Sequence, residues 1–332
     1  MYKIILSYLN EGKKGVVATV VGKEGAAPRE EGAKMFIGED KQCFGTIGGG
    51  RLEAEVIDEA MKSMDISAAR LLHFRMDAKT VADAGMLCGG NVDVLLEPVL
   101  EGHRKVYEGI EECETKGIEA VLITRLKKSG VWKSLIDRNG SAWGDAIGSE
   151  EIASLRDFWN ENHVRFVNNH TVVEHLAAHS NLYIFGAGHV SQFLSKVAKM
   201  VGFKVTVIDD RAEFANTQRF PEADTVVVSD FQDVFSQIDF AANSYVVIVT
   251  RGHSHDARVL EHCVRLPMAY IGMIGSKRKV RVVLDYLKEK GVSEDILKSI
   301  HAPVGIPINS ETPQEIAISI VAELIHTRGM RK

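Results

Sequence analysis

Hydrophobic residues in the second half of the chain occur as short unbroken runs that alternate with stretches of helical periodicity. We expect strands at five of these runs: Leu182–Phe185, Lys204–Ile208, Thr225–Val228, Tyr245–Val249 and Met268–Ile274. Helices are expected between them, at Val190–Val201, Ala257–Val264 and Val280–Lys290. Strands that are apolar throughout and alternate with helices are typical of a parallel sheet covered on both faces. The pattern therefore predicts a Rossmann-like domain.

A final helix is indicated by the tetrapeptide that begins at Thr312. Thr312 is a suitable N-cap, Pro313 suits the first helical position, and Glu315 stands three residues after the cap, which together make a capping box. Ile316, Ile320 and Leu324 then recur at helical spacing, so we expect them on one buried face.

The first half of the chain has no strand–helix alternation of this kind. Its expected elements are strands at Val16–Val21, Leu71–Phe74 and Val92–Leu96, a helix at Leu52–Met64, and hairpins that join Met35–Ile37 to Cys43–Ile47 and Val121–Leu126 to Val131–Ile136. We find no internal repeat in the sequence. The chain is therefore expected to be an α/β protein, with a mixed α+β domain over residues 1–175 and a C-terminal Rossmann-like, cofactor-binding parallel-sheet domain over residues 176–332.

The composition of the chain argues against two classes of partner, nucleic acids and membranes. The 332 residues carry 40 Lys and Arg against 45 Asp and Glu, a formal net charge of −5, and no basic stripe with interleaved aromatic residues. We therefore expect no nucleic-acid partner. No apolar run approaches the roughly 20 residues of a membrane span, and the N-terminus does not read as a targeting segment, so we expect a cytoplasmic protein and no membrane partner. Four scattered cysteines indicate reduced thiols.

The sharpest local motif begins at Gly186 and reads GAGHVS, directly between an expected strand and an expected helix. Gly186 permits the tight turn, Gly188 permits close approach of a phosphate, and the helix that starts at His189 offers free amides and a positive dipole end. Asp209 closes the second strand, where an acid can hold a ribose hydroxyl, and Arg211 can accept an extra phosphate. The alternative is a Rossmann-like domain whose ancestral site is empty.

Two further loops are expected at the same edge of the sheet, because ligands of open parallel sheets bind outside the carboxyl ends of the strands. One reads RGHSHD and offers Arg251 and Gly252 to the phosphate. Its His253, His255 and Asp256 are also metal-ligand types, but we favour a phosphate-facing loop with Asp256 capping the next helix, and no metal.

The other loop presents Gly275, Ser276 and Lys277 as anion donors. The basic residues that follow oppose the dipole of the helix they begin, which indicates a compensating anion nearby.

In the first half, three consecutive glycines, Gly48, Gly49 and Gly50, precede Arg51 at the start of an expected helix. Glycines allow close backbone approach to a ligand, and the Arg51 guanidinium suits a phosphate. Flexible-turn glycines are an equal alternative on spacing alone. Cys88 precedes two further glycines, although a buried inert cysteine is the commoner case.

Taken together and in order, eight short motifs that cover nearly the whole chain resemble the xanthine dehydrogenase accessory proteins of the XdhC/CoxI type. They are GAAPR at Gly25–Arg29, GTIGGGRLE at Gly45–Glu53, CGG at Cys88–Gly90, LYIFGAG at Leu182–Gly188, VTVIDDR at Val205–Arg211, TRGHSHD at Thr250–Asp256, YIGMIGSKR at Tyr270–Arg278 and HAPVGIPINSETPQEI at His301–Ile316.

The resemblance implies a protein that binds the molybdenum cofactor (molybdopterin), protects it, assists replacement of an oxo ligand by sulfur, and helps insert it into a xanthine dehydrogenase-type molybdoenzyme. It thus favours an accessory protein over a stand-alone enzyme. It leaves open whether the chain transfers sulfur itself or recruits a cysteine desulfurase. We also expect a homodimer.

The chain departs from the family pattern at one position. Many members carry a cysteine in the N-terminal glycine motif, in a pattern such as SGGCVE, where this chain has Arg51. A thiol at that position cannot contribute here, which leaves Cys88 as the thiol in a glycine-rich setting. Cys88 is therefore our candidate for sulfur or metal contact, provided that its neighbours lower its pKa.

Two other functions remain open from the residues. One is an NAD(P)-dependent oxidoreductase acting on a small carbonyl compound, with His253 or His255 as the catalytic proton donor. The other is a non-enzymatic nucleotide-sensing module whose first half contacts a partner.

Overall fold

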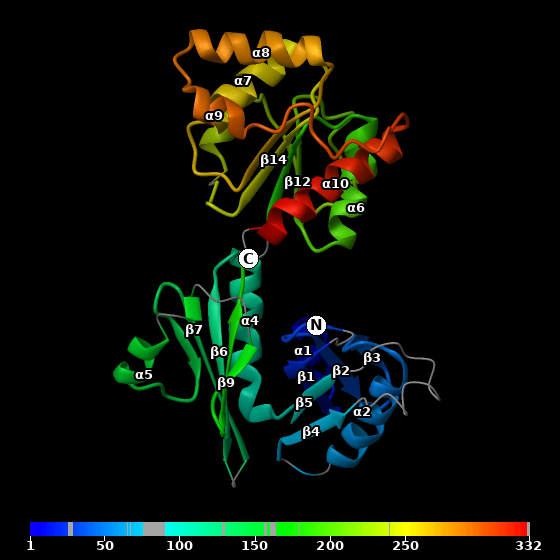
Figure 1. Cartoon of the computed structure of the whole chain (residues 1–332), viewed down its shortest axis with the longest axis vertical. Coiled ribbons are helices and arrows are strands. Elements are labelled where there is room, and N and C mark those ends of the chain that lie inside the picture. Colours follow the sequence, from blue (N-terminus) through cyan, green and yellow to red (C-terminus); the bar gives the residue numbers. More distant parts are fainter. Residues whose placement is uncertain are drawn as a thin grey trace. The chain divides into compact units, whose positions relative to one another are not determined.

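The computed structural model describes the chain except residues 26–28, 65, 67, 76–89, 128–129, 156–157, 160–163, 179, 239 and 331–332, and except the side chains of Ser149 and His253. The described residues form two compact units, Met1–Ala178 and His179–Lys332 (Figure 1). Each unit has its own hydrophobic clusters.

The second unit is built on a parallel sheet, as the continuous apolar runs predict. Its strands pair in the order β13-β12-β11-β14-β15, and every pairing is parallel. The strands are β11 (Asn181–Phe185), β12 (Lys204–Asp209), β13 (Thr225–Val228), β14 (Ser244–Ile248) and β15 (Tyr270–Met273). Because the chain order reverses between β11 and β14, the crevice that such sheets use for ligands lies at the carboxyl end of β11. The predicted Rossmann-like fold is confirmed.

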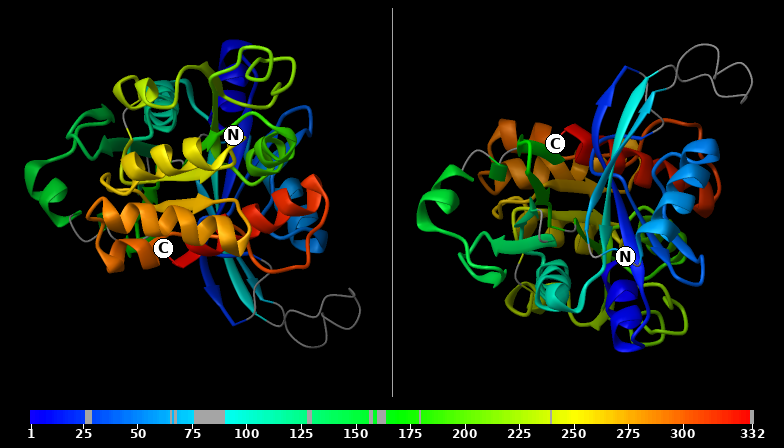
Figure 2. Two further views of the ribbon diagram at one scale, coloured as in Figure 1. Left: turned by 90° about the horizontal axis from the view of Figure 1, so that it is seen from above. Right: turned by 90° about the horizontal axis from the view of Figure 1, so that it is seen from below.

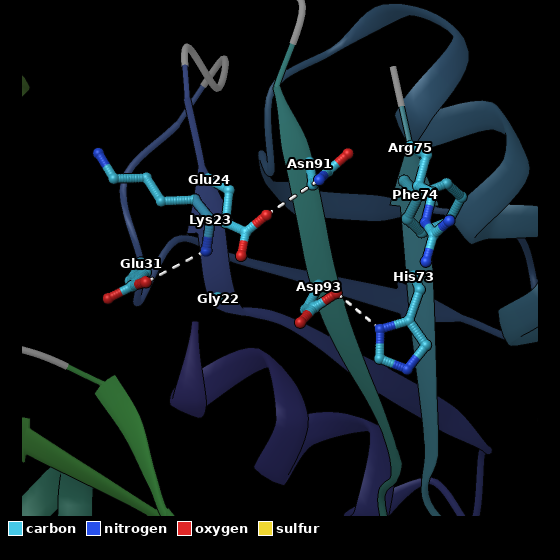
Figure 3. Close-up of a pocket in the computed structure, with 9 residues that line it drawn as sticks. All are labelled: Gly22, Lys23, Glu24, Glu31, His73, Phe74, Arg75, Asn91 and Asp93. Atoms are coloured by element: carbon cyan, nitrogen blue, oxygen red, sulfur yellow. Dashed lines mark hydrogen bonds and ion pairs between the residues drawn. The ribbon is translucent and has the colours of Figure 1, made fainter. Parts of the chain in front are cut away.

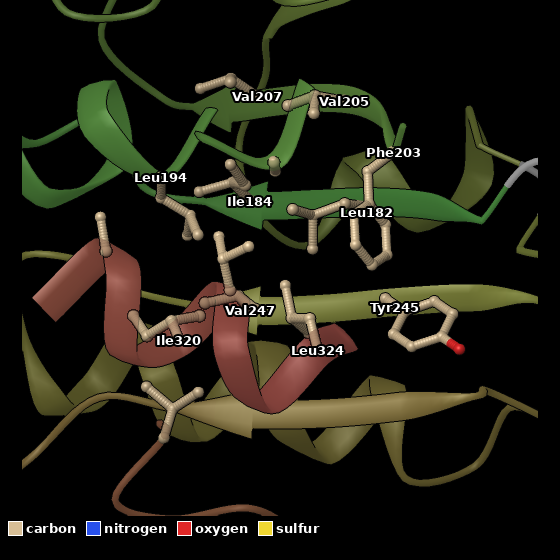
Figure 4. Packing of buried hydrophobic residues seen from close by; sticks show 14 of the residues in the cluster. Leu182, Ile184, Leu194, Phe203, Val205, Val207, Tyr245, Val247, Ile320 and Leu324 are labelled. Atoms are coloured by element: carbon tan, nitrogen blue, oxygen red, sulfur yellow. The ribbon is translucent and has the colours of Figure 1, made fainter. Parts of the chain in front are cut away.

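Helices cover both faces of this sheet. They are α6 (His189–Met200), η3 (Asp233–Ser236), α7 (His253–Cys263), α8 (Lys277–Glu289), α9 (Glu294–Ser299) and α10 (Pro313–Met330). On one face α6 and α10 pack against the strands, and Leu194, Ile320 and Leu324 meet Ile184 and Val247 there (Figure 4). On the other face lie α7 and α8, coloured yellow to orange in Figure 2. Truncating one such core residue to alanine would cost about 2–5 kcal/mol.

The predicted cap of the last helix is present. The Glu315 carboxylate accepts the backbone amide of Thr312 at 3.0 Å, and the Thr312 hydroxyl accepts the amide of Glu315 at 3.3 Å. This reciprocal pair satisfies two amides that the first turn would otherwise leave without partners.

The first unit contains two antiparallel sheets. Sheet A pairs in the order β3-β2-β1-β5-β4 and sheet B in the order β8-β7-β6-β10-β9. The elements of the first half are α1 (Tyr2–Asn10), β1 (Gly15–Glu24), β2 (Lys34–Gly38), β3 (Cys43–Gly45), α2 (Gly50–Ser63), β4 (Arg70–Arg75) and β5 (Asn91–Pro98). Those of the second half are η1 (Glu101–His103), α4 (Arg104–Lys116), β6 (Ala120–Lys127), β7 (Gly130–Asp137), β8 (Ala142–Gly144), α5 (Ser149–Ser154), β9 (Val164–Asn168) and β10 (Thr171–Leu176).

Sheets A and B repeat one another in structure, although the sequence shows no internal repeat. Each sheet follows a helix and places its elements in the same order, with α2 or α5 between the third and fourth strands (Figure 1). The registers also agree, because Thr19 pairs with Lys34 as Thr124 pairs with Lys133. The repeat cannot be detected in the sequence, because most equivalent positions only need an apolar side chain, which many residue types provide.

Two ion pairs join the repeats. Lys133 Nζ lies 2.8 Å from Glu97, with side chains only 4% and 7% exposed, and Lys34 Nζ lies 2.8 Å from Glu174, with both side chains 12% exposed. In the first pair the lysine lies in sheet B and the glutamate in sheet A, and in the second pair the equivalent strands exchange these roles. They therefore fix which strand of sheet A faces which strand of sheet B.

Candidate functional site

The site of the second unit is built around the turn that follows β11, here called the glycine turn (residues 186–188). Gly186 has φ +110°, its amide donates to the Ile208 carbonyl at 2.7 Å, and a Cβ at this position would collide with the Val249 carbonyl. Only glycine suits both the backbone conformation and the close approach of β14.

Helix α6 begins directly after its N-cap residue Gly188, with open space in front of that glycine. Within the described residues, no side chain caps this helix, and a Cβ on Gly188 would meet nothing within 4 Å. The first-turn amides of a helix have no intrahelical partner and lie at the positive end of its dipole. His189, the first helical residue, is exposed. The turn can therefore receive an anion directly on backbone amides.

Ser191 takes the place of the third glycine of the dinucleotide-binding pattern. Its side chain is fully buried, and its hydroxyl donates to the Gly186 carbonyl at 2.5 Å. This hydrogen bond ties the first turn of α6 back to the glycine turn, so serine in place of the third glycine still holds the helix against the strand.

Asp209 at the end of β12 holds the glycine turn from the other side. The residue is only 2% exposed, and its carboxylate accepts the Ala187 amide at 2.7 Å and the Arg211 Nε at 2.8 Å. Burial alone would raise the pKa of Asp209, but the hydrogen bonds from Arg211 and Ala187 outweigh it and hold that pKa below its ordinary value. Both oxygens are engaged within the chain, so the carboxylate is not presented to a ribose.

Two arginines flank one aromatic ring beside this turn. The guanidinium carbon of Arg211 lies 3.8 Å from the centre of the Phe214 ring, and that of Arg219 lies 5.1 Å from it. Arg219 Nη2 also approaches the Ala187 carbonyl at 3.5 Å. Contact with Phe214 helps to hold both cations close to the glycine turn.

The loop after β14 contributes Arg251, whose Nη2 lies 2.8 Å from Asp210 Oδ2. Gly252 is the N-cap of α7, so His253, His255 and Asp256 lie in the first turn of a helix rather than in a loop. The His255 ring packs edge-on against Phe231 at 5.4 Å.

Asp256 does not cap α7, contrary to our expectation. Its buried carboxylate instead accepts the Thr250 hydroxyl at 2.5 Å and pairs with Lys279 at the start of α8. Asp256 is therefore a compensating anion of the kind that the basic start of this helix indicates, supplied by the chain itself.

The third loop places Gly275, Ser276 and Lys277 where β15 meets α8. The Ser276 hydroxyl caps the helix and accepts the Lys279 amide at 3.3 Å, and within the described chain Lys277 is exposed and has no ion-pair partner. Ser276 is thus used for capping, while Lys277 is available to a ligand.

The glycine motif of the first unit is partly satisfied by its own chain. Gly48, Gly49 and Gly50 all have positive φ, and the Glu53 carboxylate accepts the Thr46 hydroxyl at 2.5 Å. Burial alone would raise the pKa of Glu53, but hydrogen bonds from Thr46 and from backbone amides of the motif lower it. Arg51 is exposed, and its Nε lies 2.5 Å from Glu55.

A cavity of about 320 Å³ opens at one end of sheet A, where β1, β4 and β5 meet (Figure 3). His73 Nδ1 lies 2.7 Å from Asp93 there, and the side chain of Asn91 donates to Glu24 at 3.0 Å. The expected GAAPR and CGG motifs adjoin these strands in sequence. Residues 26–28 of the first motif and Cys88 of the second lie outside the described residues.

Comparison with known proteins agrees with the observed fold. A family model described as the XdhC Rossmann domain matches residues 182–324, and one described as the XdhC and CoxI family matches residues 8–75. The chain belongs to the XdhC and CoxI family. The family resemblance of the sequence motifs is thereby confirmed.

Relatives of this XdhC-family chain align along most of it. It is 25% identical to a probable xanthine dehydrogenase subunit of Bacillus subtilis over 96% of this chain and 95% of that protein, and 23% identical to the molybdenum cofactor insertion chaperone PaoD of Escherichia coli over 96% and 85%. It is 28% identical to YqeB of Escherichia coli over 94% of this chain but spans only 43% of YqeB. A solved xanthine dehydrogenase from Bacillus halodurans superposes with a TM-score of 0.85 at 27% identity, over 100% of this chain and 96% of that one.

Two kinds of feature are absent from the described part of this XdhC-family chain. No cluster of three or more His, Cys, Asp or Glu side chains there is arranged to hold a metal ion. No helix there is long and apolar enough to cross a bilayer.

Sequence analysis missed three contributors to this XdhC-family site: Asp210, Phe214 and Arg219. We did not single out Asp210, because its neighbour Asp209 occupies the position of the ribose-binding acid in the dinucleotide motif. Phe214 and Arg219 lie in a loop without periodicity, and no spacing rule predicts that Arg219 meets the glycine turn. The aromatic residue between two arginines, 211 and 219, was the available signal.

Proposed function

We propose that this chain binds the phosphate of the molybdenum cofactor at the glycine turn and acts as an accessory protein in the maturation of a xanthine dehydrogenase-type molybdoenzyme. The observation that carries the proposal is the start of α6. There, among the described residues, a helix follows a parallel strand through the glycine turn and begins at a glycine with no capping side chain and with open space in front of it. Such a helix start is a preformed site for a phosphate.

The chain's residues fit a phosphate-bearing ligand. Gly188 admits the phosphate, the amides that follow it bind the phosphate oxygens, and Arg251 and Lys277 supply positive charge at the same edge of the sheet. Asp209 acts as a positioning residue, because it fixes the Ala187 amide and therefore the direction in which the turn faces. The cofactor itself supplies a redox-active molybdenum centre to the enzyme that receives it.

The names of two relatives support the same function. PaoD is a molybdenum cofactor insertion chaperone, and the Bacillus subtilis relative is a probable xanthine dehydrogenase subunit. A chaperone of this kind must hold a reactive ligand and then release it. Binding through backbone amides and partly exposed cations, without a covalent bond, suits that task.

The test is equilibrium binding of purified molybdenum cofactor under anaerobic conditions, measured with inorganic pyrophosphate as a competitor. We expect saturable binding of one cofactor per chain and its displacement by pyrophosphate, because both ligands would occupy the glycine turn. NADH is the comparison ligand, and tighter binding of NADH than of the cofactor would support an oxidoreductase instead. Absence of cofactor binding would refute the proposal.

A further inference from the structure

Arg251 and Asp210 stand on opposite sides of the glycine turn and are joined across it. Strand β11, which leads into the turn, lies between β12 and β14. Gly186 contacts β12 through the Ile208 carbonyl and closely approaches the Val249 carbonyl after β14. Because Asp210 follows β12 and Arg251 follows β14, their 2.8 Å ion pair spans the mouth of the turn.

This pair differs from its neighbour in how easily it can be exchanged. Arg211 and Asp209 are 22% and 3% exposed, and several hydrogen bonds join them. Arg251 and Asp210 are 47% and 24% exposed and share one short contact. Exposed pairs of the second kind contribute little to stability, so an incoming anion can replace Asp210 at little cost.

Asp210 also keeps an unused acceptor. Its Oδ1 is buried and, among the described residues, accepts no hydrogen bond, and Arg211 Nε lies 3.7 Å from it. A buried carboxylate oxygen without a donor is unfavourable. A ligand that brings a hydroxyl or amino group next to its anionic group would satisfy this oxygen.

We propose that the Arg251–Asp210 pair is a self-blocking latch over the glycine turn. The anionic group of the ligand replaces Asp210 as the partner of Arg251, and the released carboxylate then accepts a hydrogen bond from a hydroxyl or amino donor of the same ligand. The inference rests on the proposed function only in taking the glycine turn as an anion site. It adds that Asp210 competes with the anionic group of the ligand for Arg251.

The latch predicts that substitutions of its two residues change the affinity for an anion in opposite directions. Asp210→Asn keeps the shape of the side chain but removes the competing charge, so affinity for a simple anion should rise about two- to fivefold, the range expected for an exposed ion pair. Arg251→Ala should lower that affinity at least as much. In the Arg251→Ala background, Asp210→Asn should have no further effect, because the competition it relieves is already gone.

The experiment is calorimetric titration of the full chain with inorganic pyrophosphate at low ionic strength, for the wild type, both single variants and the double variant. Glu213→Gln, which removes an exposed charge from the same loop, is the matched control and should change the affinity less than Asp210→Asn does. Asp210→Ser is a second variant in case the asparagine disturbs the loop.

Weaker or unchanged binding by Asp210→Asn and Asp210→Ser would overturn the latch. The same gain with and without Arg251 would also overturn it, because simple charge repulsion would then explain the result. If no variant bound pyrophosphate, the latch would fall, whereas cofactor binding would be judged by its own titration. Latch behaviour toward pyrophosphate without any cofactor binding would refute the proposed function and leave the latch standing.

Discussion

The carboxylate of Asp209 accepts the backbone amide of Ala187 at 2.7 Å, which joins the end of one strand to the turn after its neighbour. The same carboxylate holds Arg211. One buried charge therefore sets both the direction of the glycine turn and the position of a nearby cation. In this chain Asp209, the acid at the end of the second strand of the parallel sheet, therefore positions the groups of the site through its hydrogen bonds.

Replacing this acid should loosen the turn. We expect Asp209→Asn to destabilise the second unit by about 2–4 kcal/mol, because it leaves a partly buried guanidinium without its charged partner. Hydrogen exchange at residues 186–191 should become faster, whereas Asp230→Asn, an exposed acid after the next strand, should change little. Equal exchange in both variants would show that Asp209 does not hold the turn.

The first unit should lose stability as the pH falls below neutrality. Burial lowers the pKa of His103 in the folded state, so between that value and about 6.5 the unfolded chain binds a proton that the folded chain does not. Stability therefore falls in this interval, by at most about 1.4 kcal/mol per pH unit for one such group, and levels off below the folded pKa.

Tryptophan fluorescence measures this effect selectively, because Trp132, Trp143 and Trp159 all belong to the first unit. Urea midpoints between pH 8 and pH 5 should decline less steeply for His103→Gln than for the wild type. His175, whose pKa is also lowered by burial, accounts for a remaining decline in the variant. Parallel curves for the two proteins would contradict the prediction.

The two ion pairs between the repeats should differ in strength according to their burial. Lys133→Met leaves Glu97 buried without a cation and should cost about 3–5 kcal/mol. Lys34→Met leaves the more exposed Glu174 and should cost less. Urea unfolding followed by tryptophan fluorescence gives both values, and the reverse order would refute the ranking.

The repeat also predicts a shared glycine requirement. Gly45 and Gly144 both have positive φ, and a Cβ at either would strike the carbonyl of the lysine on the neighbouring strand. Gly140 has a similar φ of +89° but open space around it. Alanine at Gly45 or Gly144 should therefore cost more than the roughly 1 kcal/mol of backbone strain expected at Gly140. Three equal losses of unfolding free energy would contradict this.

The sequence predicted those features of the fold that are encoded by residues close together in the chain. The parallel strands and the cap at Thr312 were predicted because continuous apolar runs and capping boxes are encoded within a few residues. The repeat and its cross-sheet pairs, such as Lys34 with Glu174, depend on residues far apart in the chain. The same applies to the site, where GAGHVS predicted the turn, but the contacts of Asp210 and Arg219 arise only when separate loops meet.

The central claim is that a phosphate docks at the start of α6, and Gly188→Val tests it most directly. A Cβ at this position would meet no protein atom within 4 Å, and we expect the valine side chain to fill the space in front of the first-turn amides. Gly148→Val is the matched control, because Gly148 is also an N-cap glycine with open space around it, at the start of α5. The measurement is the anaerobic dissociation constant for the molybdenum cofactor. We predict a loss of roughly tenfold or more for Gly188→Val, as expected when charge-assisted hydrogen bonds are lost, and little change for Gly148→Val. Wild-type affinity in a folded Gly188→Val protein would contradict the account.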